Sequence, residues 1–299
     1  MNKRLNVRKT YKNFIGGAFV RSESGHVYGV TGLSIPPDMN TAQEKANPIL
    51  AQACRSTRKD IREAVVHARK AQNGWASKTA YLRGQIIYRI AEMLEDRKAN
   101  FTEELTWAGI SKRAAAKQVE TSIDRLVYYA GWTDKLSQVF GSVNPVATPH
   151  FNFSTPEPLG VVAIFCADES PLLSAVTAVA AICSGGNSAV LIPSQAYPLS
   201  ALSFGEVLHS SDVPPGVVNI LSGIHNEIMD PLASHMDVNG ICNWTDHPAS
   251  QALLDEHAAR NIKRITHQSW GDGTSDEFES PYLMMQFQEI KTTWHPVGY

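Results

Sequence analysis

Long apolar runs are absent from this sequence. A membrane-spanning helix needs roughly 18–20 consecutive apolar residues, but the richest stretch, Leu172–Ile182, is interrupted by Ser174 and Thr177. Residues 1–13 are polar and lack the apolar core of a secretory signal. We therefore expect a cytoplasmic protein that has no membrane partner.

The sequence also lacks an excess of either charge and any cluster of cysteines. Its formal net charge is -2, which gives no general attraction to nucleic acid or to anionic lipid. The basic residues near the start form only a short tail without an accompanying motif: Lys3, Arg4, Arg8 and Lys9. The four cysteines are far apart and form no CxxC pair: Cys54, Cys166, Cys183 and Cys242. We expect buried, reduced thiols and no metal site, since His257 and His267 also lack a ligand spacing.

The first half of the chain predicts a hairpin followed by helices. Residues 10–35 alternate apolar and polar types around Gly16 and Gly17, which is typical of paired strands. Residues 34–50 contain Pro36, Pro37 and Pro48 and indicate an irregular loop. Apolar residues then recur at helical spacing, which predicts three helices. These helices start after Thr57, run from Ala80 to about Asn100, and run from about Lys112 to Leu136.

From residue 157 onward the pattern changes to alternating strands and helices. Continuous apolar segments predict strands at 159–165, 188–192, 217–221, 238–242 and 262–266, with helices between them. This alternation predicts the α/β class with a parallel sheet of dinucleotide-binding (Rossmann) type. Residues 271–281 (GDGTSDEFESP) are polar and indicate a linker, and Tyr282–Trp294 alternates as a terminal strand.

Taken in order, these segments resemble the aldehyde dehydrogenase superfamily. FIGGAFV is similar to the opening strand pair of that family, and RGQIIYRIAEMLEDR and YYAGWTDK are similar to two of its helices. EPLGVVAIF, GGNSAVLIPS and VPPGVVNILSG resemble consecutive pieces of its dinucleotide domain, and QFQEIKTTWHP resembles its C-terminal oligomerisation strand. The resemblance implies a short member of the superfamily that lacks the catalytic lobe, similar to the inactive second domain of two-domain aldehyde dehydrogenases.

The resemblance also implies that the catalytic groups are lost. The family uses an asparagine amide to stabilise the oxyanion, whereas Glu169 occupies the matching position and would repel that charge. Gln268 replaces the glutamate general base and cannot take a proton. The nucleophilic cysteine of the family lies in the lobe, but here the chain passes from Gly273 through the linker to the terminal strand. We therefore expect no catalytic residue and no aldehyde oxidation by this chain alone.

The positions that hold NAD in the family have changed too. Ile192 and Gln195 replace the lysine and glutamate that contact the adenine ribose, and only Gly223 remains of a glycine-rich turn. Trp244 and Asp246 occupy a turn that receives the pyrophosphate, which they would oppose by volume and by like charge. We expect no bound cofactor.

The resemblance divides the chain into four parts. Residues 1–35 are expected to hold N-terminal strands of an oligomerisation element, and residues 56–270 a degenerate dinucleotide-binding domain. Residues 271–281 would be a linker, and residues 282–299 the C-terminal oligomerisation strand. The candidate interface residues are Phe14, Tyr282, Met284, Phe287, Ile290 and Trp294.

Three functions are compatible with these patterns. The first is a non-catalytic subunit that forms an oligomer with itself or with a full-length aldehyde dehydrogenase. The second is a subunit that still binds a nicotinamide cofactor and relies on a catalytic partner. The third is a binding module in which Asp168, Glu169, Trp244 and Gln268 line a changed cleft. Cofactor titration would distinguish the second function, and co-purification would distinguish the first from the third.

Overall fold

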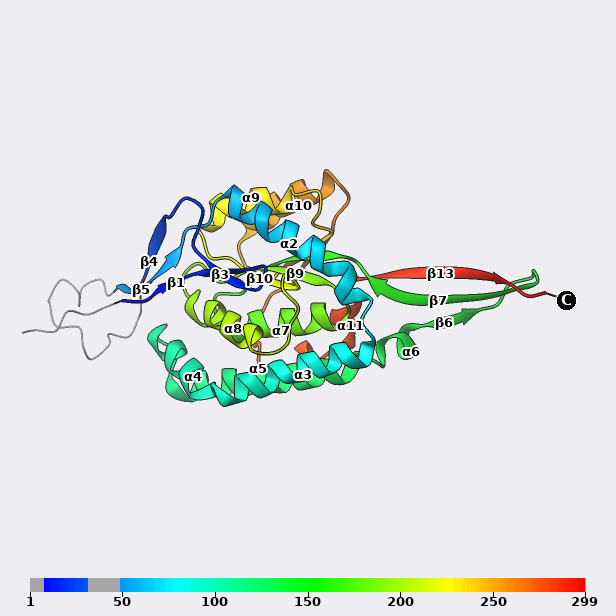
Figure 1. Cartoon of the computed structure of the whole chain (residues 1–299), viewed down its shortest axis with the longest axis horizontal. Helices are drawn as coiled ribbons and strands as arrows, with labels where there is room; N and C mark the ends of the chain where they lie inside the picture. Colours follow the sequence, from blue (N-terminus) through cyan, green and yellow to red (C-terminus); the bar gives the residue numbers. More distant parts are fainter. Residues whose placement is uncertain (1–7, 32–48, 299) are drawn as a thin grey trace, which may run out of the picture.

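A seven-stranded sheet forms the centre of the protein in the computed structural model, which describes residues 8–31 and 49–298 (Figure 1). The strand order is β12-β11-β8-β9-β10-β2-β3, and the first five of these strands are parallel. The parallel strands are β8 (Val161–Phe165), β9 (Ser188–Ile192), β10 (Val218–Ile220), β11 (Gly240–Asn243) and β12 (Arg264–His267). Strands β2 (Asn13–Ile15) and β3 (Ala18–Val20) extend this sheet as an antiparallel hairpin. The α/β class and the Rossmann-type sheet are confirmed.

Helices cover both faces of the sheet (Figure 1). One face carries α2 (Arg58–Ala76), α9 (His225–Ala233) and α10 (Pro248–Ala259). The other face carries α7 (Pro171–Ser184) and α8 (Leu199–His209), with α3 (Ala80–Asp96), α4 (Lys98–Trp107) and α5 (Lys112–Trp132) outside them. Every residue of α7 is buried because α5 covers its outer side.

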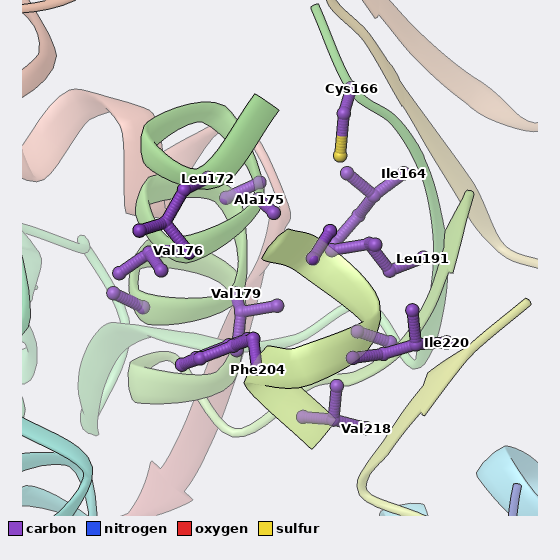
Figure 2. Close-up of a cluster of buried hydrophobic side chains, with 14 of the residues drawn as sticks. Ile164, Cys166, Leu172, Ala175, Val176, Val179, Leu191, Phe204, Val218 and Ile220 are labelled. Atoms are coloured by element: carbon purple, nitrogen blue, oxygen red, sulfur yellow. The ribbon is translucent and has the colours of Figure 1, made fainter. Parts of the chain in front are cut away.

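The apolar residues of the strands explain the two cores. Strands β8 and β9 are buried on both faces, as expected for a parallel sheet covered by helices. Figure 2 shows Ile164, Leu191 and Ile220 directed toward the α7 and α8 side of the sheet, in one cluster with Val176 and Phe204. Alternate strand residues such as Val161 and Ala163 enter the second core beneath α2 and α9.

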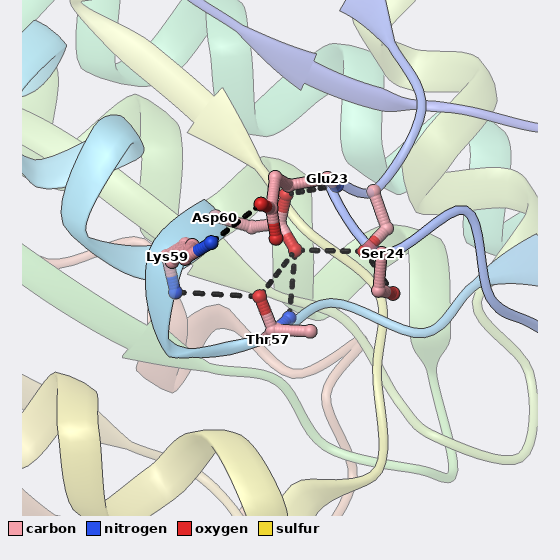
Figure 3. A network of polar contacts seen from close by, with 6 residues as sticks. Glu23, Ser24, Thr57, Lys59 and Asp60 are labelled. Carbon is pink, nitrogen blue, oxygen red and sulfur yellow. Dashed lines mark hydrogen bonds and ion pairs between the residues drawn. The ribbon is translucent and has the colours of Figure 1, made fainter.

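The start of α2 is fixed by a capping box (Figure 3). The Thr57 hydroxyl accepts from the backbone N–H of Lys59, and Asp60 Oδ2 accepts from the backbone N–H of Thr57 at 2.7 Å. Asp60 also accepts from the Ser22 hydroxyl at 2.8 Å and from the Glu23 backbone N–H at 2.9 Å. One buried carboxylate therefore caps the helix and joins it to the segment that follows β3.

Two smaller sheets extend from the body. The first has the order β1-β5-β4 and is formed by β1 (Thr10–Tyr11), β5 (Ile49–Cys54) and β4 (Val27–Thr31). The second, which we call the arm, has the order β13-β7-β6 and projects from the body as a long ribbon (Figure 1). Its antiparallel strands are β6 (Ser142–Asn144), β7 (His150–Pro158) and β13 (Gln288–Pro296), and the short helix α6 (Leu136–Phe140) leads into it.

The segment between β12 and β13 is short and ordered, and we call residues 268–287 the closing segment. It contains the 3-10 turn η1 (Asp276–Phe278) and the helix α11 (Pro281–Met285). Phe278, Met284 and Phe287 are buried in the body. No lobe is inserted between β12 and β13, as the resemblance implied.

The structure corrects three expectations about the ends of the chain. Phe14 is buried against α8 in the main sheet, so it does not belong to the arm. Residues 271–281 are not a free linker, because Phe278 packs in the core. Residues 282–285 form a helix rather than a strand, because Ser280 caps it and Pro281 occupies its first turn. Residues 1–7 and 32–48 lie outside the described residues. The second of these ranges contains most of the proline-rich loop expected at 34–50.

Candidate functional site

The candidate site lies at the carboxyl edge of the parallel strands. The loops that follow these strands meet at one edge of the sheet, where α/β proteins bind their ligands. The structure brings His247 of the loop after β11 to Asp168 of the loop after β8, with Nε2 and Oδ2 3.7 Å apart. It also joins two other loops, because the Gln195 side-chain oxygen accepts from the backbone N–H of His225 at 2.8 Å.

His225 is a residue of this edge that the sequence analysis missed. Its Nε2 lies 2.9 Å from the carbonyl oxygen of Pro193, which can only accept, so Nε2 carries the proton. Burial lowers the pKa of His225, while the Pro193 carbonyl and Asp168 oppose this effect. The ring is therefore neutral at neutral pH and keeps Nδ1 as an acceptor. Its position two residues after Gly223, at the start of α9, is the only sequence signal that could have indicated it.

The positions expected to have lost cofactor contacts carry no cationic group. Ile192 ends β9 with its side chain buried in the core beneath α2, where it cannot contact a ligand at the edge. Gln195 is exposed and is already bonded to His225. Gly223 is buried, and a side chain there would press on Ile228. Thus Ile192, Gln195 and Gly223 offer no cation for a ribose or a phosphate.

Two of the helix starts at this edge, those of α9 and α10, have carboxylates beside them. Glu227 lies in the first turn of α9 and forms a two-bond ion pair with Arg55, whose Nε is 2.9 Å away. Asp246 precedes α10 and accepts from the Ser269 hydroxyl at 3.4 Å. A pyrophosphate binds best at a helix N-terminus that carries no other anion. The starts of α9 and α10 are therefore poor sites for a pyrophosphate.

Trp244 does not line the cleft. This corrects two expectations: that its volume obstructs a pyrophosphate, and that it lines the changed cleft of the binding-module hypothesis. Its side chain is completely buried and packs against Trp270 at 4.8 Å and Phe278 at 5.8 Å between ring centroids. Trp270 and Phe278 lie 4.3 Å apart and come from the closing segment. The three rings therefore join β11 to the closing segment as part of the core.

A buried arginine holds the closing segment from the other side. Arg125 of α5 is fully buried, and its Nε lies 3.2 Å from Glu279 Oε1. Its Nη2 donates to the carbonyl oxygens of Gly273 at 3.2 Å and Ser275 at 2.5 Å. These contacts place an ordered polypeptide where the sequence analysis expected a flexible connection.

The expected catalytic positions carry no nucleophile. Glu169 is exposed beside Asp168, and the backbone N–H of Gln268 donates to the Asn243 carbonyl at 3.2 Å. All four cysteines of the chain are buried. Burial raises the pKa of Cys183 to about 12 and raises the pKa values of Cys166 and Cys242 further, so these three thiols stay protonated. Figure 2 shows Cys166 within the apolar cluster.

Two other kinds of site are absent from residues 8–31 and 49–298. No group of three or more histidine, cysteine, aspartate or glutamate side chains in these ranges could hold a metal ion. No helix there is long and apolar enough to cross a membrane.

Comparisons with known proteins identify the family. Residues 36–272 match the model of the "Aldehyde dehydrogenase family". The chain is 31% identical to cytosolic 10-formyltetrahydrofolate dehydrogenase of Xenopus tropicalis, over 94% of this chain and 30% of that protein. It is 30% identical to the putative aldehyde dehydrogenase DhaS of Bacillus subtilis, over 97% of this chain and 56% of that protein. The chain belongs to the aldehyde dehydrogenase family.

Solved structures agree with this assignment. The NAD+ complex of an aldehyde dehydrogenase from Bacillus cereus superposes with a TM-score of 0.79 and 25% identity, over 87% of this chain and 51% of that chain. The HpcC protein from Thermus thermophilus gives a TM-score of 0.80 and 25% identity, over 87% of this chain and 48% of that chain. The chain thus spans about half of these structures and a third to a half of the curated relatives.

Proposed function

We propose that this protein is a non-catalytic aldehyde dehydrogenase-like subunit that assembles through its arm. Its partner is a further copy of the chain or a full-length aldehyde dehydrogenase, in which it has a structural or regulatory role. The observation that carries this proposal is the arm itself, which projects from the body as a ribbon (Figure 1). Several of its large apolar side chains are exposed. The lack of an accessible thiol at the carboxyl edge supports the non-catalytic part.

Both faces of the arm have an apolar surface. On one face Trp294 is 56% exposed and Ile290 is 53% exposed. On the other face Val143 and Phe151 are exposed, and the Phe151 and Phe153 rings pack 5.6 Å apart. Covering a half-exposed large apolar side chain contributes roughly 1 kcal/mol, so several of them together favour association. Of the six interface residues expected from the sequence, only Ile290 and Trp294 lie on the arm.

The outer strands of the arm are also free to pair. Strand β13 bonds to β7 on one side only, and β6 covers only three residues of the opposite edge of β7. A long unpaired strand edge with apolar neighbours readily accepts another strand. Edge pairing together with burial of Ile290 and Trp294 would give a specific interface.

We also propose that the subunit binds no nicotinamide cofactor. The proposal rests on the carboxylates beside the starts of α9 and α10, Glu227 and Asp246, and on the buried apolar side chain at Ile192. A changed binding cleft is a second candidate, because neutral His225 lies near Asp168 and His247 at the same edge of the sheet.

Paired substitutions test the assembly directly. Ile290→Lys with Trp294→Lys should lower the molar mass measured by light scattering, for the chain alone or co-expressed with an aldehyde dehydrogenase of the same cells. The matched control is Val66→Lys with Tyr88→Lys, since Val66 is 51% exposed and Tyr88 is 49% exposed on body helices. An unchanged mass in the arm variant, or an equal loss in the control, would overturn the proposal.

A further inference from the structure

A separate pocket lies at the amino edge of the sheet, opposite the candidate site. Most of its lining residues come from the turns that lead into β8, β11 and β12, whereas Glu289 comes from β13; the pocket has a volume of about 460 Å³. The lining residues that determine its chemistry are Lys263, Asn261, Met236, Val238, Leu159 and Glu289. This volume accommodates a small organic molecule.

Lys263 is a buried amine that lines this pocket. It is only 8% exposed, and its Nζ donates to the carbonyl oxygen of His235 at 2.6 Å. No carboxylate lies within ion-pair distance of it in the described ranges, and Asp237 pairs with Arg69 at 3.8 Å instead. Burial lowers the pKa of Lys263 to about 8, an effect that nearby Asp237 partly opposes. A buried lysine in this state supplies neutral amine near neutral pH.

Asn261 provides an unused acceptor in the same pocket. Its Oδ1 is buried without a hydrogen-bond partner, whereas its Nδ2 donates to Met236 Sδ at 3.5 Å. Between Asn261 and Lys263, Ile262 adopts a left-handed φ of 57° with its side chain 94% exposed. A β-branched residue is strained in this conformation. A buried polar atom without a partner indicates a missing donor.

We propose that Lys263 captures small apolar carbonyl compounds, aldehydes or ketones, as an imine. The Nζ lone pair attacks the carbonyl carbon, the carbonyl π pair moves to oxygen, and an amine proton is transferred to that oxygen. The resulting carbinolamine hydroxyl donates to Asn261 Oδ1. The hydroxyl then leaves with the remaining amine proton as water, and the nitrogen lone pair forms the C=N bond. The sum is amine plus carbonyl giving imine plus water, and no oxidant or reductant takes part.

The surroundings select the substrate class. Leu159, Met236 and Val238 give the pocket apolar walls that favour a short hydrocarbon substituent. The charged groups at its rim are paired, since Arg264 Nη2 bonds Glu289 Oε1 at 2.6 Å. His235 is a further titratable neighbour, and its pKa is lowered first by its own burial and then by the positive charges of Lys263, Arg62 and Arg58. A neutral carbonyl compound therefore fits better than a charged one.

Reductive trapping tests this proposal on the intact chain. The protein is incubated with propanal, the imine is reduced with borohydride, and peptide mass mapping gives the propylation rate of each lysine. At pH 7 an amine with a pKa of about 8 has about 300-fold more neutral form than one at 10.5. Allowing for its lower intrinsic nucleophilicity, we expect Lys263 to react at least about tenfold faster than exposed Lys70 of α2. The rate at Lys263 should level off above about pH 8.

Three variants provide the controls. Lys263→Arg, which keeps a donor for His235, should abolish the fast site, and Lys70→Arg should leave it unchanged. Asn261→Ala should slow labelling at Lys263 and not at Lys70. The comparison of Lys263 with Lys70 is made in the unaltered chain, so it does not depend on whether a variant folds. Equal labelling of the two lysines, slower labelling of Lys263, or a rate indifferent to Asn261→Ala would overturn the proposal.

Discussion

Replacement of Arg125 tests how the closing segment stabilises the body. Arg125→Met keeps much of the length and the apolar stem of the side chain but removes the guanidinium. The variant loses the contact to Glu279 and leaves the Gly273 and Ser275 carbonyl oxygens without their donor. It also loses the cation–π contact with Phe278, in which the guanidinium carbon lies 5.7 Å from the centre of the ring.

The expected loss in the free energy of unfolding is about 3 kcal/mol. Breaking a buried ion pair from one side costs roughly 3–5 kcal/mol. The lower end applies because Glu279 keeps 28% of its side chain exposed and can be hydrated. Glu279→Gln keeps an acceptor for Arg125 and should cost about 1 kcal/mol, since only the charge on the bond changes.

Urea unfolding followed by tryptophan fluorescence gives these values, because Trp244 and Trp270 lie in the same cluster. Hydrogen exchange should show that residues 271–280 lose protection before α7 does. Arg113→Met on the exposed side of α5 is the matched control and should change the stability by less than about 0.5 kcal/mol. A loss below about 1 kcal/mol for Arg125→Met would refute the role assigned to this residue.

Two other predictions concern a buried acid and the cofactor edge. Burial raises the pKa of Glu104, whose Oε1 accepts from the hydroxyls of Tyr11 and Ser203. Because the folded pKa lies above the unfolded one, ionisation of Glu104 costs stability as the pH rises above its ordinary range. Glu104→Gln should therefore raise the melting temperature at pH 7 relative to pH 4; an equal shift at both would contradict this. Calorimetry with NAD+ and NADP+ should give dissociation constants in the millimolar range or weaker, and a low micromolar value would show a working site.

The sequence predicted the parallel sheet well because its strands are locally unambiguous. Val161–Phe165 and Ser188–Ile192 are short continuous apolar runs between helical segments, and this pattern has few other solutions. Strand β7 (His150–Pro158) was not predicted. It contains Pro156 and Pro158, and its partner β13 lies more than a hundred residues later. Pairing over such a distance leaves no local trace in the sequence.

The candidate site was predictable in position but less so in orientation. The loops after the strands could be placed at one edge, but the sequence does not state whether Trp244 points to the cleft or to the core. Its direction depends on Trp270 and Phe278, which the closing segment supplies. The apolar run at 282–285 likewise suits a strand or a helix, and the Ser280 cap with Pro281 decides it. Burial of Phe14 follows from pairing of β2 with β10, a contact across the whole domain.

Steady-state aldehyde oxidation is the most direct test of whether this chain is catalytically inactive by itself. The purified full chain, and variants that each replace one of its four cysteines by serine, are assayed with a panel of aldehydes and both nicotinamide cofactors. We expect no reduced cofactor above the rate without protein, because all four thiols are buried and a carboxylate, Glu169, stands at the carboxyl edge where an oxyanion donor is needed. A turnover rate that scales with the concentration of this protein and falls when one cysteine is replaced would contradict it.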